Sequence, residues 1–282
     1  MAELPSYRPA STFSLDALST IITAAFAGYF YPTIVTPALL AQRIRAEQLD
    51  LQHSLVLWHA DAPAGIAMLG LRGQQAWCGG FGITASLRGQ QLAGGLATAM
   101  IEQARLAGAQ ALRLEVLVRN TPALRVYLRA GFQPRRDLLV LQWRRAAGAA
   151  APEPTSGPVV VERDPRSLLA HFDRLHAAPA AWQRDLPALL VGANLAGLAI
   201  LAADQPVAYL LYHTNSAGKH QVADLAAGHA DLAQALLGAL QQRSEQIFSV
   251  NEPADSPVTD AYRAAGFSEA DRQHELWLEL ER

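Results

Sequence analysis

The chain of 282 residues is long enough for about two domains of ordinary size, and its 51% hydrophobic content can fill sizeable cores. Its net charge of −2 gives no basic field of the kind that attracts nucleic acid or acidic membranes, so we expect neither as a partner. Cys78 is the single cysteine, which excludes an internal disulfide and agrees with a cytoplasmic location.

Two long uncharged stretches resemble targeting or membrane segments at first sight. Residues 17–31 follow Asp16 and lack a basic leader, so they predict an amphipathic helix rather than a signal peptide. Residues 186–203 are interrupted by a proline, an asparagine and two glycines, whereas a membrane helix needs about 20 mostly apolar residues. They predict the end of a helix, a turn and a buried strand.

The first predicted element is a helix over residues 12–31, where polar caps precede apolar residues at helical spacing. Its last part is aromatic, and core or loop packing is the simplest interpretation of these aromatic side chains. A second helix is predicted over residues 36–47, because a proline at position 37 suits the first helical turn.

Three strands are predicted next. Residues 54–59 and 66–72 flank a turn at residues 61–65 and predict a hairpin, and residues 75–83 predict the following strand. That strand contains Gly-Gly-Phe-Gly at residues 79–82. Glycine within a strand marks a bulge or a close approach of another backbone segment.

The stretch after this strand is the most informative part of the chain. Residues 88–95 read Arg-Gly-Gln-Gln-Leu-Ala-Gly-Gly and open a predicted helix. The first amides of a helix have no internal partner and carry partial positive charge, and small residues let an anion approach them closely. Such a loop can bind a pyrophosphate, and Arg88 would add a charged fork of donors. Alone, the loop is a weak signal.

The segment beyond this helix makes the signal specific. A predicted strand at residues 111–118 leads to a short helix at about residues 122–129. With the loop, this spacing resembles the GCN5-related N-acetyltransferase (GNAT) superfamily, whose members carry R-G-x-G-x-G/A and then N-x-x-A-x-x-x-Y-x-x-x-G-F. Gln91 replaces the second glycine of the loop, which can still present its amides if position 91 is helical. The matching positions are Arg88, Gly89, Ala93, Asn120, Ala123, Tyr127, Gly131 and Phe132.

The resemblance implies a site for acetyl-CoA as co-substrate. In that superfamily the strand before the loop splays from its neighbour, and the thioester and pantetheine arm insert there. The implied cofactor-binding residues are Phe81, Gly82, Ile83, Arg88, Gly89, Gln90, Gln91, Leu92, Ala93, Gly94 and Asn120.

The resemblance also gives the aromatic segment a second interpretation. In the superfamily the first two helices and their connection shape the acceptor site. Phe26, Tyr29, Phe30 and Tyr31 are therefore either substrate-binding residues in one wall of that site or packing residues.

Two side chains are the candidates for catalysis. Glu115 lies on the predicted strand and Tyr127 on the helix that follows, in a pattern L-E-V-x-x-x-N…Y that resembles the ribosomal-protein alanine acetyltransferase branch. In that branch the glutamate is the base and the tyrosine the acid. An amine must be neutral to attack a thioester, and a carboxylate can remove its proton. The alternatives are a surface carboxylate for Glu115 and a buried packing phenol for Tyr127. Asn120 is expected to cap the helix and touch the pantetheine arm.

The second half of the chain repeats the first after a linker at residues 146–158 that is rich in proline and small residues. Residues 262–267 mirror residues 127–132 at an offset of 135, and the order of predicted elements agrees. At the same offset the loop falls on residues 223–230, Ala-Asp-Leu-Ala-Ala-Gly-His-Ala, which include no arginine. The second copy is therefore predicted to lack a cofactor site, with Tyr262 as a packing residue.

We therefore expect a mixed α/β fold in two tandem GNAT-like copies: a catalytic domain at residues 1–145 and a degenerate domain at residues 159–282. The predicted function is direct transfer of an acetyl group from acetyl-CoA to a primary amine of a small molecule or peptide, in a ternary complex. A non-catalytic acyl-CoA-binding module is the alternative, and a hydroxyl acceptor or a longer acyl donor is a third possibility. No spacing of histidine and cysteine indicates a metal site. A monomer with an internal pseudo-dimer, or a homodimer, is expected.

Overall fold

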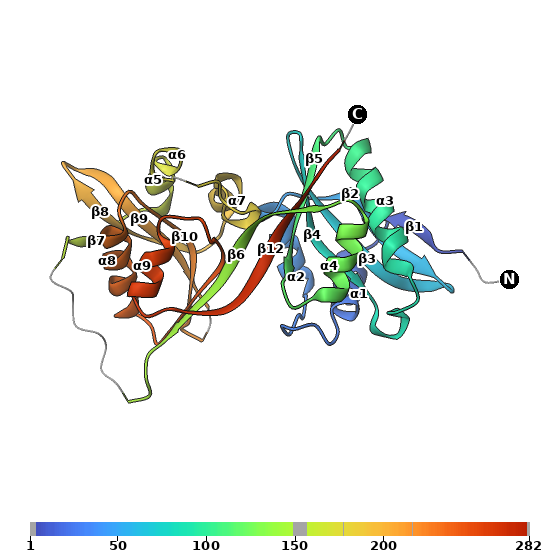
Figure 1. Cartoon of the computed structure of the whole chain (residues 1–282), viewed down its shortest axis with the longest axis horizontal. Coiled ribbons are helices and arrows are strands. Elements are labelled where there is room, and N and C mark those ends of the chain that lie inside the picture. The colour runs from blue at the N-terminus through green and yellow to red at the C-terminus, as the bar shows by residue number, and fades with distance from the viewer. Residues whose placement is uncertain (1–3, 149–156, 177, 216, 281–282) are drawn as a thin grey trace. The chain divides into compact units, whose positions relative to one another are not determined.

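The computed structural model describes residues 4–148, 157–176, 178–215 and 217–280 (Figure 1). It contains two compact units, the first made of Met1–Arg135 with Glu275–Arg282 and the second of Arg136–His274. Each unit combines a β-sheet with helices, so the expected mixed α/β class is confirmed.

The sheet of the first unit has the strand order β1-β2-β3-β4-β5-β12. Neighbours from β1 to β4 pair antiparallel, whereas β4 and β5 pair parallel. The strand bounds are β1 (Ser6–Pro9), β2 (Leu49–His59), β3 (Ala62–Arg72), β4 (Gln75–Ile83), β5 (Ala111–Leu117) and β12 (Ser268–Glu279).

The helices of the first unit are α1 (Leu15–Ala25), α2 (Pro37–Ala46), α3 (Leu92–Leu106) and α4 (Thr121–Arg129), with 3₁₀ turns η1 (Ala10–Thr12) and η2 (Ala85–Leu87). The hydroxyls of Ser14 and Thr36 accept hydrogen bonds from the first turns of α1 and α2 and so start these helices. Because α1 ends at Ala25, the aromatic segment predicted to continue it lies instead in the connection to α2.

One core of the first unit contains α3 and one face of β5. Leu112 and Leu114 of β5 share this core with Leu96 of α3. Side chains alternate along a strand, so Arg113 and Glu115 project from the opposite face. This alternation places the candidate base away from the helix that follows the glycine loop.

The second unit repeats this arrangement. Its sheet has the order β6-β11-β10-β9-β8-β7, and β10 and β11 pair parallel, as β4 and β5 do. The strands are β6 (Gln133–Arg144), β7 (Val160–Glu162), β8 (Leu195–Ala202), β9 (Gln205–Thr214), β10 (His220–Ala227) and β11 (Gln246–Pro253). The helices are α5 (Pro165–Leu169), α6 (Phe172–Leu175), α7 (Leu186–Val191), α8 (Ala230–Gln241) and α9 (Thr259–Ala264), with the 3₁₀ turn η3 (Trp182–Arg184).

The last strand of each half differs from the domain bounds predicted from the sequence. The strand predicted at residues 137–143 is present as β6, but from Arg136 onward it belongs to the second unit, where it pairs with β11. The end of β12, from Glu275, belongs to the first unit. Both strands carry alternating leucines, so their local patterns cannot specify which sheet each one joins. Of the predicted linker, residues 149–156 lie outside the described residues.

The leucines of β12 test this assignment. Leu276 is fully buried in the core of the first unit, so Leu276→Ala should lower the free energy of unfolding by about 2–5 kcal/mol, the usual range for a leucine deleted from a core. Chemical denaturation measures the loss. The exposed Glu279→Ala on the same strand is the control, with an expected change within about 0.5 kcal/mol. Equal, small effects of both substitutions would contradict a packed β12.

Candidate active site

The central feature of the first unit is a divergence of its two parallel strands. β4 and β5 pair at Gln75, Ala76 and Trp77, whereas β4 goes on pairing with β3 as far as Ile83. A bulge at Gly79 lies where the divergence begins, because Leu69 opposes Cys78 and Met68 opposes Gly80. The splay expected from the resemblance is therefore present.

Packing explains why glycine occupies the bulge. A Cβ atom on Gly79 would lie 2.4 Å from an atom of the Trp77 ring, a distance that no side chain tolerates. The bulged carbonyl of Gly79 accepts a hydrogen bond of 2.7 Å from Nη2 of Arg43 on α2. The bulge is thus fixed by an arginine from a neighbouring helix.

Arg88 binds main-chain carbonyls of two other elements. Its Nε donates to the carbonyl of Ile83 at 3.0 Å, and its Nη2 donates to the carbonyls of Ala25 at 3.0 Å and Ala27 at 2.7 Å. These bonds tie the end of β4 to the end of α1. They use Nε and Nη2, and the expected contact of Arg88 with a pyrophosphate stays a prediction.

The loop itself offers its main-chain amides. α3 begins at Leu92, its first turn contains no acidic residue, and no side chain caps it. Gln91 has a φ of 61°, so position 91 does not meet the helical condition stated above but is left-handed, a conformation that suits the glycine of the resembled motif. Gly94 is exposed, and a Cβ on it would have no neighbour within 4 Å. An anion can therefore approach the first turn of α3.

Glu115 is a buried carboxyl with one free oxygen. Nε1 of Trp77 donates to its Oε2 at 2.8 Å, while its Oε1 is buried without a hydrogen-bond partner among the described residues. The pKa of Glu115 is raised to about 7, mainly by burial. The charges of Glu275 and Glu47 also raise it, whereas the hydrogen bond from Trp77 and the charge of Arg113 lower it. Such a carboxyl can both take and release a proton near neutral pH.

Tyr127 lies on α4, near the splayed part of β4. Its ring contacts Phe81 and Phe132 edge to face, with centroid distances of 5.5 Å and 5.8 Å. Burial raises the pKa of Tyr127 well above its ordinary value, and the Cys78 thiol and Tyr29 phenol raise it further. The phenol is therefore protonated at neutral pH, as a proton donor must be.

Asn120 caps α4 as predicted. Its Oδ1 accepts a hydrogen bond of 3.4 Å from the amide of Ala123. The expected contact with a pantetheine arm stays a prediction.

The aromatic segment forms a cluster between α1 and α2. The rings of Phe26 and Tyr29 lie 5.3 Å apart, and those of Tyr29 and Phe30 lie 5.4 Å apart, all edge to face. The Arg119 guanidinium, just beyond β5, lies 4.5 Å from the Phe30 ring and 5.5 Å from the Tyr31 ring. Phe30 and Tyr31 are about 40% exposed, so part of this cluster faces solvent.

Sequence reasoning missed several residues of this site. Trp77 is not among the residues singled out from the sequence, although its indole Nε1 donates a hydrogen bond to Glu115. Arg113 and Arg119 carried no signal other than their positions two residues before Glu115 and just after β5. Glu275 lies 160 residues from Glu115, and only the exchange of the last strands brings it into the first unit.

The second unit contains a related splay. β10 and β11 pair as far as Val222 and Ser249, and β10 has a register shift between Val222 and Asp224. A short loop leads to α8, whose first turn contains Asp231 and so disfavours an anion.

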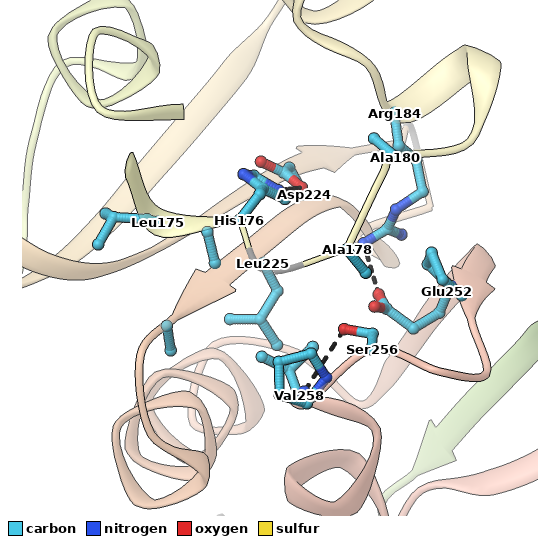
Figure 2. Close-up of a pocket in the computed structure, with 14 residues that line it drawn as sticks. Leu175, His176, Ala178, Ala180, Arg184, Asp224, Leu225, Glu252, Ser256 and Val258 are labelled. Carbon is cyan, nitrogen blue, oxygen red and sulfur yellow. Dashed lines mark hydrogen bonds and ion pairs between the residues drawn. The ribbon is translucent and has the colours of Figure 1, made fainter. Parts of the chain in front are cut away.

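The space between these strands is filled by side chains (Figure 2). Nε2 of His176 lies 3.0 Å from Oδ1 of Asp224, and the Tyr209 hydroxyl donates to Oδ2 at 2.7 Å. Arg184 forms a buried ion pair of 2.5 Å with Glu252. Burial lowers the pKa of His176, but its hydrogen bond to Asp224 and the charge of that carboxylate raise the pKa overall.

The cavity left in this pocket has a volume of about 20 Å³, enough for about one water molecule and too small for an acyl chain. The hydroxyl of Tyr262 donates to Oγ of Ser249 at 3.0 Å, in agreement with its predicted packing role.

A substitution at Gly94 tests whether the loop before α3 binds the pyrophosphate. Gly94→Glu should abolish binding of coenzyme A, because the new carboxylate would stand at the first-turn amides of α3, and titration calorimetry measures the loss. The fold should persist, since glutamate is favourable in a first helical turn. Gly94→Gln has the same size without the charge and should bind more tightly than Gly94→Glu.

The matched control lies in the second unit. Gly228 precedes α8 and is equally open, so Gly228→Glu should leave coenzyme A binding unchanged at one molecule per chain. If the two glutamate variants behave alike, the anion site is not at α3.

Comparison with known proteins agrees with this geometry. Residues 19–132 match the model of the Acetyltransferase (GNAT) family. This segment runs from α1 to the end of the α4 turn and includes the loop, Glu115 and Tyr127. A search of curated proteins gave no match.

Solved structures share the fold over the whole chain. A GCN5-related N-acetyltransferase from Sphaerobacter thermophilus has a TM-score of 0.73 at 17% identity, covering 99% of this chain and 96% of that one. A tandem GNAT protein from the clavulanic acid biosynthesis pathway has a TM-score of 0.71 at 14% identity and covers 99% of both chains. At these identities the likeness shows the fold, including its tandem arrangement. None of the helices among the described residues is long and apolar enough to span a membrane.

Proposed function

We propose that this chain is an N-acetyltransferase that moves the acetyl group of acetyl-CoA directly to a primary amine. The observation that carries the proposal is the Glu115 carboxyl, buried beside the splayed strands with a pKa of about 7 and with Oε1 unpartnered among the described residues. The family match over residues 19–132 and the fold of the similar structures support it. Without an acceptor to deprotonate, such a buried carboxyl is only a destabilising feature.

Acetyl-CoA would be held by the splay and the loop together. Backbone groups of Phe81, Gly82 and Ile83 lie on the diverging part of β4, where the β5 side is open to pairing with a pantetheine arm. The first amides of α3, from Gln91 to Gly94, would bind the pyrophosphate. Arg88 would support the site through the carbonyls that it binds, and its predicted contact with the phosphate remains part of the proposal.

The acceptor amine would reach Glu115 from the side of the aromatic cluster. Phe26, Tyr29, Phe30 and Tyr31 are proposed as one wall of that approach, with Arg119 stacked on it. A small molecule or a peptide terminus can present such an amine.

In the proposed mechanism, acetyl-CoA supplies an acyl group activated as a thioester. Glu115 accepts one proton from the acceptor ammonium group, so that the nitrogen lone pair can form the new C–N bond. As the C–S bond breaks, Tyr127 donates its phenolic proton to the departing sulfur. The acylated nitrogen loses its second proton, which returns to the Tyr127 phenolate through solvent, and Glu115 releases the first proton to solvent. These roles follow the resemblance to the ribosomal-protein alanine acetyltransferase branch.

An acetyl-transfer screen against small amines and peptides tests the proposal, with hydrolysis of acetyl-CoA alone as the background. Amine-dependent release of free thiol is the expected result. Tight binding of acetyl-CoA without transfer to any amine would instead favour a non-catalytic binding module.

Tyr127→Phe tests the acid. The substitution keeps the ring contacts with Phe81 and Phe132 and removes only the hydroxyl. We expect turnover to fall by about 10²–10⁴, the usual scale for general acid–base catalysis, with little change in coenzyme A affinity. Turnover and melting temperature are measured on one preparation. Unchanged turnover with a lower melting temperature would show that Tyr127 only packs.

Glu115→Gln tests the base. The pKa of Glu115 is raised to about 7, so wild-type kcat/KM should fall as pH drops below about 7, where the carboxyl is protonated. The amide variant should lose this acid limb and be least impaired at high pH, where the amine arrives neutral. A pH profile with the same acid limb in both proteins would exclude Glu115 as the base.

A further inference from the structure

The end of β12 carries an acidic residue to the face of β5 that bears Glu115. β12 lies next to β5 in the sheet, and the amide of Leu280 donates to the carbonyl of Gln110 at 2.8 Å. Further back along β12, Trp277 and Glu275 both contact Arg113 of β5. The Arg113 guanidinium lies 5.6 Å from the Trp277 ring, and its Nη1 lies 3.9 Å from Oε1 of Glu275.

This contact is buried. The side chains of Arg113 and Glu275 are 8% and 1% exposed, so their charges are poorly screened by water. Arg113 and Glu115 are two residues apart on one strand and therefore share a face. The same guanidinium is thus within reach of two carboxyl groups, Glu275 and Glu115.

We propose that Glu275 is a positioning residue for the acetyl-transfer base: it holds the Arg113 guanidinium, so that Oε1 of Glu115 stays free to take a proton from the acceptor amine. This inference rests on the proposed function for its catalytic meaning. The geometry beneath it, a buried arginine between two acidic residues, does not depend on that function.

The charges around Glu115 explain why a second acidic residue is needed. From α2, Arg43 is bound to the C-cap residue Glu47 at 2.7 Å and to the carbonyl of Gly79, and the charge of Glu47 adds to the rise in the pKa of Glu115. From β4, the indole of Trp77 donates to Oε2 of Glu115 and not to Oε1. The titratable group that β4 contributes is the Cys78 thiol. On β5, Arg113 is the cation nearest in sequence to Glu115.

Without Glu275, Arg113 would bind Glu115. A guanidinium paired with a buried carboxylate stabilises the charged form by charge-assisted hydrogen bonds, and it would cover the oxygen that must reach the amine. Glu275 prevents this by supplying a competing partner, and its own negative charge also disfavours ionisation of Glu115. The second half of the chain therefore contributes to catalysis through its last strand.

Glu275→Gln tests the proposal. Removing this charge takes away the pairing of Arg113 with Glu275 and the repulsion between Glu275 and Glu115, so the pKa of Glu115 should fall. The acid limb of kcat/KM should then move down by about one pH unit, within the range expected for a new ion pair. Glu279→Gln, an exposed neighbour on β12, is the matched control and should leave the limb in place. Arg113→Gln should move the limb the other way, to higher pH. If the acid limb of kcat/KM stays in place in both Glu275→Gln and Arg113→Gln, the proposal is wrong.

A direct titration separates this inference from the proposed function. Carbon-13 NMR of carboxyl-labelled glutamate, with Glu115→Gln to assign the signal, follows ionisation of Glu115 without any acceptor. The signal of Glu115 should titrate at a lower pH in Glu275→Gln than in the wild type, even if no amine is acetylated. Failure of the Glu275 proposal can therefore be distinguished from failure of the proposed acetyltransferase function.

The milder substitution Glu275→Asp keeps the proposal testable if Glu275→Gln or Arg113→Gln does not fold. It keeps the charge but draws the carboxylate back from Arg113, so a smaller downward shift of the Glu115 titration is expected. If the Glu115 titration in that variant equals that of the wild type, the proposal is wrong.

Discussion

The divergence of β4 from β5 is the constraint on which the rest of the first unit depends. Two parallel strands that stayed paired would bury their main-chain groups and leave no place for a ligand. The bulge at Gly79 ends the pairing, and Arg43 binds the carbonyl that the bulge turns out of the ladder. The loop of α3, the phenol of Tyr127 and the carboxyl of Glu115 are all arranged around the opening.

Both units contain a pair of diverging parallel strands, but only in the second unit do paired charged side chains fill the space between them. In the second unit the strands also diverge after a bulge, but Asp224, His176, Arg184 and Glu252 fill the space with paired charges. Filling a splay with a satisfied polar network costs less than leaving its polar groups unpaired. Because the network occupies the space, the first turn of the neighbouring helix need not bind an anion, which is consistent with Asp231 in the first turn of α8.

The sequence predicts the local features of this site better than the long-range ones. The caps of α1, α2 and α4, the glycine bulge and the loop before α3 follow from neighbouring residues, and all are present. Arg88 shows the limit: its charge suggested a phosphate ligand, but three carbonyls from two other elements compete for its donors. Which partner an arginine chooses depends on backbone that is distant in sequence.

The assignment of β6 and β12 to their units also depends on partners that are distant in sequence. Leu139 of β6 and Leu276 of β12 are both fully buried, and alternation places each in a core without stating which core. The domain boundary that the sequence predicts after residue 145 therefore separates Glu275 from Glu115. Because the end of β12 lies beside β5, truncating the chain at the linker would remove the neighbour of β5 together with the charge of Glu275 near the candidate base. The last strand of the chain, from Glu275, is thus part of the unit that contains the candidate site.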